Sequence, residues 1–352
     1  MRAKNALPAK TAGNPVPISG YLMPMRKQTL FAAGAAASLL FSSCTLKDIL
    51  TDGTGVESTQ DQVVRGLRIA LAAGIDTSAA FAGRANAYLA HAVIRILLPE
   101  DAEQALAAAE KAGAYLGDFR AELQAMNAAV KLAGLESGAY SSNLARAATA
   151  LEDAADLEHL GDSLVKYMNR GAEMAAPRSV PIFKSAITSM TLTDGLALLN
   201  SADSTAATGY LNGRTFVSLN TAYAPLVDST LALVPLTKYW ADFRSAYNSL
   251  LANYRTLLDF QSSWNANALV SSVPALRVDA LGAVEYEPIK TENLGAWTTE
   301  KALTGLFWLV GEEEKEIRRD PFGYAKGLAA DAADLLEKVF GEIMEMGTAD
   351  SP

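Results

Sequence analysis

Apolar residues recur every three or four positions through most of the chain after residue 60, which is the spacing of one face of an α-helix. The clearest stripe lies near the C-terminus and contains Leu328, Ala332, Leu335, Leu336, Val339, Phe340 and Ile343. A second stripe contains Leu303, Leu306, Phe307, Val310 and Ile317, and a third contains Leu164, Met168, Ala172 and Ala175. These patterns predict an all-α fold, with a single multi-helix domain over residues 61–347.

Capping and helix-breaking residues indicate where some of these helices should begin and end. A threonine at an N-cap accepts a hydrogen bond from a free amide of the first turn, and proline cannot continue a helix. The expected boundary residues are Thr298 or Thr299 before the second stripe, Asp320-Pro321 after it, Pro177 after the third stripe, and Thr193 and Asn200 at the two ends of a short helix.

Two parts of the domain give weaker predictions. Alanine-rich stretches near residues 100–160 have high helix propensity and few bulky side chains, so they predict either a close helical hairpin or a mobile insertion. Residues 262–298 show no clear period and are predicted to form a loop. Within that loop, Leu276–Val278 and Val284–Tyr286 are candidates for a short strand pair.

The first 60 residues differ from the helical region. Met25-Arg26-Lys27 precedes an apolar run, Leu30–Phe41, that is shorter than the roughly 18 residues a spanning helix needs. A basic segment, a short apolar segment and small residues in this order are typical of a secretory signal peptide. We therefore expect residues 1–43 to be a signal peptide and residues 44–60 to be a flexible tether. Residues 1–22 indicate either a later start codon or an unusually long leader.

The residues before the single cysteine refine this prediction. Phe41-Ser42-Ser43-Cys44 resembles the lipobox of bacterial lipoproteins, although leucine is usual in place of Phe41. The resemblance implies that Cys44 is the lipid attachment residue, carrying a diacylglyceryl group, and that its amino group takes an acyl chain such as palmitate. Thr45 in place of aspartate implies the outer membrane, with the domain facing the periplasm. The alternative is an ordinary signal peptide whose removal leaves a free thiol.

The charge of the chain restricts its partners. Residues 1–43 contain five of the 30 Lys and Arg residues and none of the 39 Asp and Glu residues, so the remaining chain has 25 basic residues and a net charge of −14. Nucleic acids and anionic headgroups select positive surfaces. We therefore expect no nucleic-acid partner, and we expect membrane contact through the lipid anchor alone.

Five stretches are distinctive in sequence and order: MNRGAEMAAPRSVPIFKSAITSMTLTDGLALLNS (168–201), AATGYLNGRT (206–215), VDSTLALVPLTKYWADF (227–243), TEKALTGLFWLVGEEEKEIRRDP (299–321) and LLEKVFG (335–341). Together they resemble the bacterial family called domain of unknown function 4197. Its members are commonly secreted or lipidated, so the resemblance implies an all-helical envelope lipoprotein and implies no reaction. Near residues 117–160 and 253–297 the chain looks longer than the family pattern.

The sequence contains none of the common catalytic or metal-binding motifs. It has no GxSxG, HExxH, phosphate loop or CxxC, and two histidines are too few for most zinc or haem sites. His91 lies in the apolar stretch AYLAHAVIRILL, which predicts a core or boundary histidine within a helix. His159 follows several acidic residues and is expected at the surface. We therefore predict no catalytic residue, metal ligand or cofactor.

A few polar residues are candidates for a pocket. Glu314 and Arg318 are four residues apart in a charge run that is typical of a solvated helix face, unless one of them turns inward toward a buried polar partner. In AATGYLNGRT, a structural role for Thr208 is favoured over ligand binding. The candidate pocket contains Asn169, Glu173, Thr208, Tyr210, Glu314 and Arg318. The aromatic residues Tyr239, Trp240, Phe243, Tyr247 and Tyr254 are expected to form a core stripe instead of a sugar-binding platform.

These observations favour a non-catalytic envelope lipoprotein that binds a protein partner or an apolar ligand. A helical bundle can hold a small molecule in a mostly apolar pocket between its helices. The alternative is a hydrolase that uses Glu and Asp with an arginine. That alternative gains support if one concave pocket with shifted pKa values brings together Asn169, Glu173, Thr208, Tyr210 and Glu314.

Overall fold

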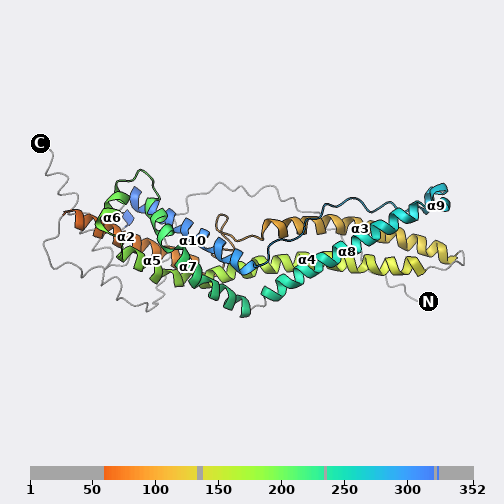
Figure 1. Cartoon of the computed structure of the whole chain (residues 1–352), viewed down its shortest axis with the longest axis horizontal. Helices are drawn as coiled ribbons and strands as arrows, with labels where there is room; N and C mark the ends of the chain where they lie inside the picture. The colour runs from red at the N-terminus through yellow and green to blue at the C-terminus, as the bar shows by residue number, and fades with distance from the viewer. Residues whose placement is uncertain (1–58, 133–137, 234–235, 321–322, 325–352) are drawn as a thin grey trace, which may run out of the picture. The chain divides into compact units, whose positions relative to one another are not determined.

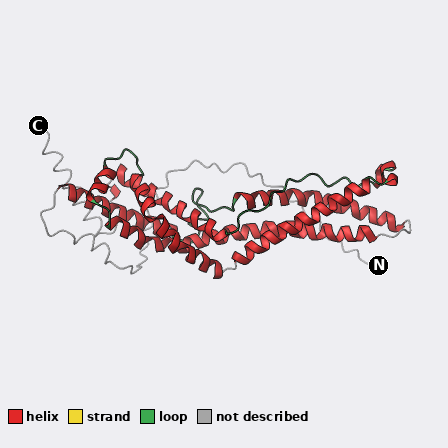
Figure 2. Cartoon of the chain, in the orientation of Figure 1, coloured by secondary structure: helices red, strands yellow, loops and turns green. Residues whose placement is uncertain are grey.

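The computed structural model describes residues 59–132, 138–233, 236–320 and 323–324. Over these residues the backbone forms helices, turns and loops and no strand, as Figure 2 shows, and the all-α prediction is confirmed. The described residues belong to one compact unit, which confirms the single multi-helix domain. The signal peptide, Cys44, most of the tether and the stripe at 328–343 lie outside the described residues. Within the described part of the chain, no helix combines the length and apolar composition that a bilayer crossing requires.

One group of helices packs around α2 (Thr59–Ala82) and α10 (Leu294–Arg319). It also contains α5 (Ser179–Thr188), α6 (Leu192–Leu199) and α7 (Ala206–Leu233) (Figure 1). Apolar side chains at helical spacing meet between these elements and are removed from water, which is the main stabilising contribution to such a bundle. Its fully buried members include Ile69, Ile75, Phe183, Leu219 and Leu306.

A second group consists of α3 (Glu100–Leu132), α4 (Gly138–Ala175), α8 (Leu236–Asn265) and α9 (Ala268–Ser272) (Figure 1). Helices α3 and α4 pack against each other as a hairpin, so the first of the two predictions for the alanine-rich stretches is confirmed. Their small side chains permit this close packing, since Ala105, Ala109, Ala112, Ala147 and Ala150 are all buried. Helix α4 also contacts α7 and α10.

The predicted helix boundaries are partly confirmed. Helix α4 ends at Ala175, before a 3-10 turn that contains Pro177, and α10 ends at Arg319, before Asp320. The short helix α6 has Thr191 as its N-cap instead of Thr193, because Thr191 and Asp194 complete a reciprocal capping box.

Helix α10 begins five residues earlier than predicted. Its N-cap is Asn293, whose side chain accepts a hydrogen bond from the amide of Ala296. Thr298 and Thr299 lie buried inside the helix instead of capping it. The hydroxyl of Thr298 donates to the carbonyl of Leu294, four residues back, so this threonine needs no capping role to satisfy its polar group.

The stretch around His91 is not a helix. Helix α2 ends at Ala82, and Asn86 has a positive φ of 62°, which breaks the helical path. A turn ends at Ile94, residues 95–99 form neither helix nor strand, and every second side chain from Ile94 to Leu98 is buried. His91 itself is half-buried against the rings of Phe81 and Trp308. The predicted boundary position of His91 is therefore confirmed, and the predicted helical conformation of this stretch is wrong. His159 is exposed, as predicted.

The aromatic stripe of α8 is part of the core. Trp240, Phe243, Tyr247 and Tyr254 are buried, and Tyr239 is half-buried. The rings of Trp240 and Phe243 stack with centroids 5.5 Å apart. The core interpretation of these residues is therefore confirmed.

Candidate functional site

Glu314 of α10 turns inward and binds the first turn of α7. Its side chain is 2% exposed. One carboxylate oxygen accepts hydrogen bonds from the amide of Ala207 at 3.0 Å and from Nε of Arg318 at 2.9 Å. The other accepts from the amide of Thr208 at 2.7 Å and from its hydroxyl at 2.8 Å. Glu314 therefore caps α7 from another helix, and it does not lie on a solvated face.

This arrangement has a clear electrostatic reason. The first amides of a helix have no partner within the helix and carry the positive end of its dipole, so a carboxylate placed there is stabilised. Arg318 balances the buried charge and also donates to the carbonyl of Leu198, in the last turn of α6, at 3.0 Å. The three residues Thr208, Glu314 and Arg318 thus join α6, α7 and α10.

Asn169 and Glu173 lie in a different place, on α4. The amide group of Asn169 is fully buried and pairs with both backbone groups of Ile96, donating at 2.8 Å and accepting at 2.9 Å. It donates a further bond to the carbonyl of Val165. Glu173 is 2% exposed and pairs with Arg170 at 3.1 Å. Burial, then the neighbouring Tyr223 and Glu173, raise the pKa of Tyr88 well above its usual value.

The candidate pocket residues therefore fall into separate groups. Glu173 lies near Tyr88, and Tyr88 packs against Gly305 of α10. Glu314 lies nine residues further along α10, which corresponds to about 14 Å of axial rise. Tyr210 belongs to a third group, where its hydroxyl lies 3.4 Å from a carboxylate oxygen of Asp194. The structure brings Thr208, Glu314 and Arg318 together, and it does not join them to Asn169 and Glu173.

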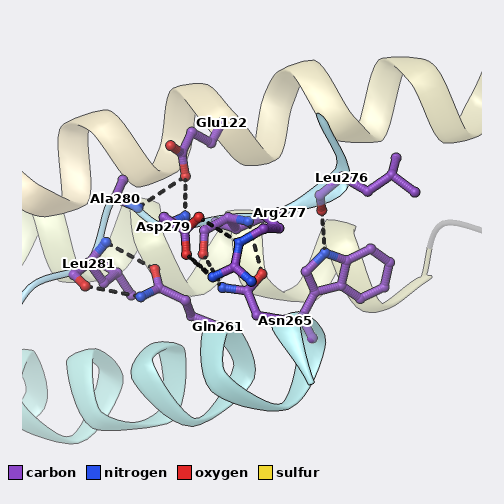
Figure 3. Close-up of polar contacts among 10 residues, drawn as sticks. Glu122, Gln261, Asn265, Leu276, Arg277, Asp279, Ala280 and Leu281 are labelled. Carbon is purple, nitrogen blue, oxygen red and sulfur yellow. Dashed lines mark hydrogen bonds and ion pairs between the residues drawn. The ribbon is translucent and has the colours of Figure 1, made fainter. Parts of the chain in front are cut away.

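The loop predicted for residues 262–298 is confirmed over residues 277–293, whereas the two ends of that range belong to α8, α9, a 3-10 turn and α10. Residues 276–291, here called the strap, begin at the last residue of a 3-10 turn, Pro274–Leu276, and run from Arg277 onward in extended conformation without forming a strand. The predicted strand pair within this segment is therefore wrong. The backbone of the strap binds side chains of α3 and α8 instead of another strand (Figure 3).

Helix α8 presents one face to the strap. Tyr247, Tyr254, Gln261 and Asn265 are spaced by seven, seven and four residues, so they lie on the same side of the helix. The amide of Asn265 pairs with both backbone groups of Val278, and the amide of Gln261 pairs with both backbone groups of Leu281 (Figure 3). The hydroxyls of Tyr254 and Tyr247 donate to the carbonyls of Gly282 and Glu287 at 2.8 and 2.9 Å.

Helix α3 contributes two carboxylates from the other side. Glu122 accepts hydrogen bonds from the amides of Asp279 and Ala280 at 3.1 and 3.2 Å (Figure 3). Near the other end of the strap, Asp101 accepts from the amides of Lys290 and Thr291 at 2.6 and 2.7 Å, and from the hydroxyl of Thr291. Carboxylates bind pairs of backbone amides strongly, because the bonds are charge-assisted.

The side chains of the strap fill the space between these polar contacts. Val278 and Leu281 are buried, and Val284, Tyr286 and Ile289 pack half-buried against the core. Gly282 lies so close to Tyr115 that a Cβ atom there would be 2.6 Å from the tyrosine ring. The hydroxyl oxygen of Tyr286 is buried and has no hydrogen-bond partner among the described residues.

A family model for proteins of unknown function (DUF4197) matches residues 57–138 and 139–341. The chain belongs to the DUF4197 family. The resemblance inferred from the sequence is thereby confirmed. Searches of curated proteins and of solved structures found no match.

In this DUF4197 chain the strap-binding side chains are the functional candidates that sequence reasoning missed. A usable signal was present on α8, because Gln261 and Asn265 continue the face of Tyr247 and Tyr254 with amide groups where a core stripe would have apolar ones. On α3, the carboxylates of Asp101 and Glu122 gave no such signal, since both are ordinary helix-surface residues in sequence. Among the described residues, no three His, Cys, Asp or Glu side chains gather as a metal site would require.

Replacing Asp101 by asparagine should destabilise this DUF4197 chain at neutral pH and have little effect in acid. Burial of Asp101 opposes its ionisation, but the bonds from Thr291 and Lys290 outweigh burial and hold the pKa of this carboxyl below its ordinary value of 3.8. A carboxyl with a lowered pKa stabilises the fold above its unfolded pKa, of about 4, and loses that contribution as the pH falls through the folded pKa.

Urea unfolding of both forms across this range measures the effect. The difference in free energy of unfolding between wild type and Asp101→Asn should be constant between about pH 7 and 5 and should shrink below about pH 4. A difference that stays the same down to about pH 3 would contradict the assigned role of the ionised carboxylate.

Proposed function

We propose that this chain is an outer-membrane lipoprotein, anchored through Cys44, whose helical domain faces the periplasm and binds a protein partner without catalysing a reaction. The anchor rests on the resemblance of Phe41-Ser42-Ser43-Cys44 to a lipobox. The observation that carries the binding role is the face of α3 and α8, which already binds an extended length of polypeptide by its backbone.

The positions of the candidate catalytic groups support binding over the alternative of a hydrolase. Glu314 accepts four hydrogen bonds, and Asn169 makes three, so each holds helices or loops together through most of its bonding capacity. A hydrolase of the kind considered would need these groups in one concave site, whereas about 14 Å of α10 separates the residues near Tyr88 from Glu314.

The anchor is tested by comparing the wild-type chain with a Cys44→Ser variant. The wild-type chain should be recovered in the outer-membrane fraction, and Cys44→Ser should be soluble, since two or three acyl chains hold a protein firmly to a bilayer. Mass spectrometry of the wild-type protein should find the N-terminal residue to be a lipid-modified Cys44. An unmodified thiol, or recovery of Cys44→Ser with the outer membrane, would reject the anchor.

The same preparations test the binding role. Wild-type protein extracted from membranes in mild detergent should retain a protein partner in stoichiometric amount, which quantitative mass spectrometry identifies. Retention of a lipid alone would favour the apolar-ligand hypothesis. Turnover of ester, peptide or glycoside substrates by the purified chain would favour the hydrolase, provided that the Glu314→Gln variant remains folded and loses it.

A further inference from the structure

We propose that the face of α3 and α8 that holds the strap is a binding site for an extended segment of a partner protein, and that the strap occupies this site when the partner is absent. The inference rests on the proposed binding function and specifies the chemistry of the partner. The strap itself shows what kind of ligand fits, because the side chains of α3 and α8 that form the site bind its backbone and pack against its apolar side chains.

The site recognises main chain more than side chain. Asn265 and Gln261 each bind both the N–H and the C=O of one strap residue, and the two tyrosine hydroxyls bind carbonyls. The carboxylates of Glu122 and Asp101 bind pairs of amides. Since every polypeptide offers these groups, an extended segment of another protein can make the same bonds, as peptides do when they bind in backbone-directed grooves.

The packing of the strap defines which segments fit. Buried positions at Val278 and Leu281 require apolar side chains. Any side chain in place of Gly282 would force the Tyr115 ring to move, so the site favours glycine immediately after the second of them. Beyond the glycine, half-buried Val284 and Tyr286 alternate with exposed residues. The partner segment should therefore read apolar-x-x-apolar-Gly-x-apolar-x-aromatic, with variable residues at the positions marked x.

The strap is an imperfect occupant of this site. The buried hydroxyl of Tyr286 has lost its bonds to water and has gained none within the described residues. A segment with phenylalanine at this position would fill the same space without that cost. The strap can also open locally, because its contacts are side-chain hydrogen bonds and the packing of a few apolar residues, and it shares no backbone ladder with α8.

A peptide of the strap sequence, LRVDALGAVEYEPIKT, provides the probe. Its binding to the lipid-free full chain, Cys44→Ser, is measured by fluorescence anisotropy. A second form of that chain carries Gly282→Val, whose side chain would occupy the space of the Tyr115 ring and should weaken the binding of the strap. The control form carries Gly213→Val on α7, where an added Cβ would have no neighbour within 4 Å.

The Gly282→Val chain should bind the peptide about tenfold more tightly than the Gly213→Val chain, because the site is then free for a larger fraction of the time. A peptide with Gly282→Val should not bind, and a peptide with Tyr286→Phe should bind more tightly than the unmodified one. Equal peptide affinity of the two chains, both folded by circular dichroism, would overturn the proposal.

Hydrogen exchange of the wild-type chain decides the matter if Gly282→Val does not fold. The amides of Val278, Leu281, Lys290 and Thr291 should exchange through an opening that leaves the amides of α8 protected. The proposal would be overturned if the strap amides and the α8 amides both exchanged only through global unfolding. A protein partner that co-purifies with the wild-type chain while these tests fail would reject this site and leave the proposed binding function standing.

Discussion

Replacing Glu314 by alanine should lower the free energy of unfolding by about 2–4 kcal/mol, somewhat less than for a fully buried ion pair, because the Arg318 side chain is 24% exposed. The change removes the acceptor for the amides of Ala207 and Thr208 and leaves Arg318 without its carboxylate. Chemical denaturation measures the loss, with unfolding followed by the helical circular dichroism signal at about 222 nm.

Glu312→Ala is the matched control for this prediction. Glu312 lies on the same helix and also pairs with a basic residue, Lys315, but both side chains are exposed. Exposed pairs contribute about 0–1 kcal/mol, so this variant should remain close to wild type. If Glu314→Ala were no less stable than Glu312→Ala, the capping role of Glu314 would be disproved.

Replacing Asn169 by alanine should lower the free energy of unfolding by about 2–4 kcal/mol. Asn169 is the partner of both backbone groups of Ile96, and all of these groups are buried. The alanine variant leaves an amide and a carbonyl without partners and opens a small void. The same denaturation experiment measures this change.

Lys166→Ala provides the comparison on α4, since Lys166 is exposed and lies one turn from Asn169. It should shift stability by less than about 0.5 kcal/mol. The segment at Ile96 should also lose protection from hydrogen exchange in Asn169→Ala and keep it in Lys166→Ala. Retained protection in Asn169→Ala would show that α4 does not hold this segment.

The helices of this protein were predictable because their information is local. The stripe of Leu303, Leu306 and Val310 fixes the buried face of α10 whatever it packs against, and the propensity of the alanine-rich stretches was sufficient for α3 and α4. Helix ends were less predictable, because several capping residues compete. At α6 the choice of Thr191 over Thr193 depends on the reciprocal bond with Asp194.

The non-helical segments were not predictable, because their partners are far away in sequence. The alternation of buried and exposed residues around Ile96 and Val284 is the period of a strand, but in both places the backbone binds side chains of helices. Glu314 was misassigned to a solvated face for a similar reason. Its sequence neighbours are charged, and the α7 amides that bind it lie more than one hundred residues earlier.

The cap on α7 has a consequence for the time course of biosynthesis. The residues that Glu314 binds, Ala207 and Thr208, precede it by 107 and 106 residues. Ribosomes add about 5–20 residues per second, so the start of α7 exists for roughly 5–20 s before its acceptor has been synthesised. The interval is longer for Asp101, because its partner Thr291 is synthesised 190 residues later. Nascent chains that stop before Glu314 will therefore lack the cap on α7, and those that stop before Lys290 will also lack the contact between Asp101 and the strap.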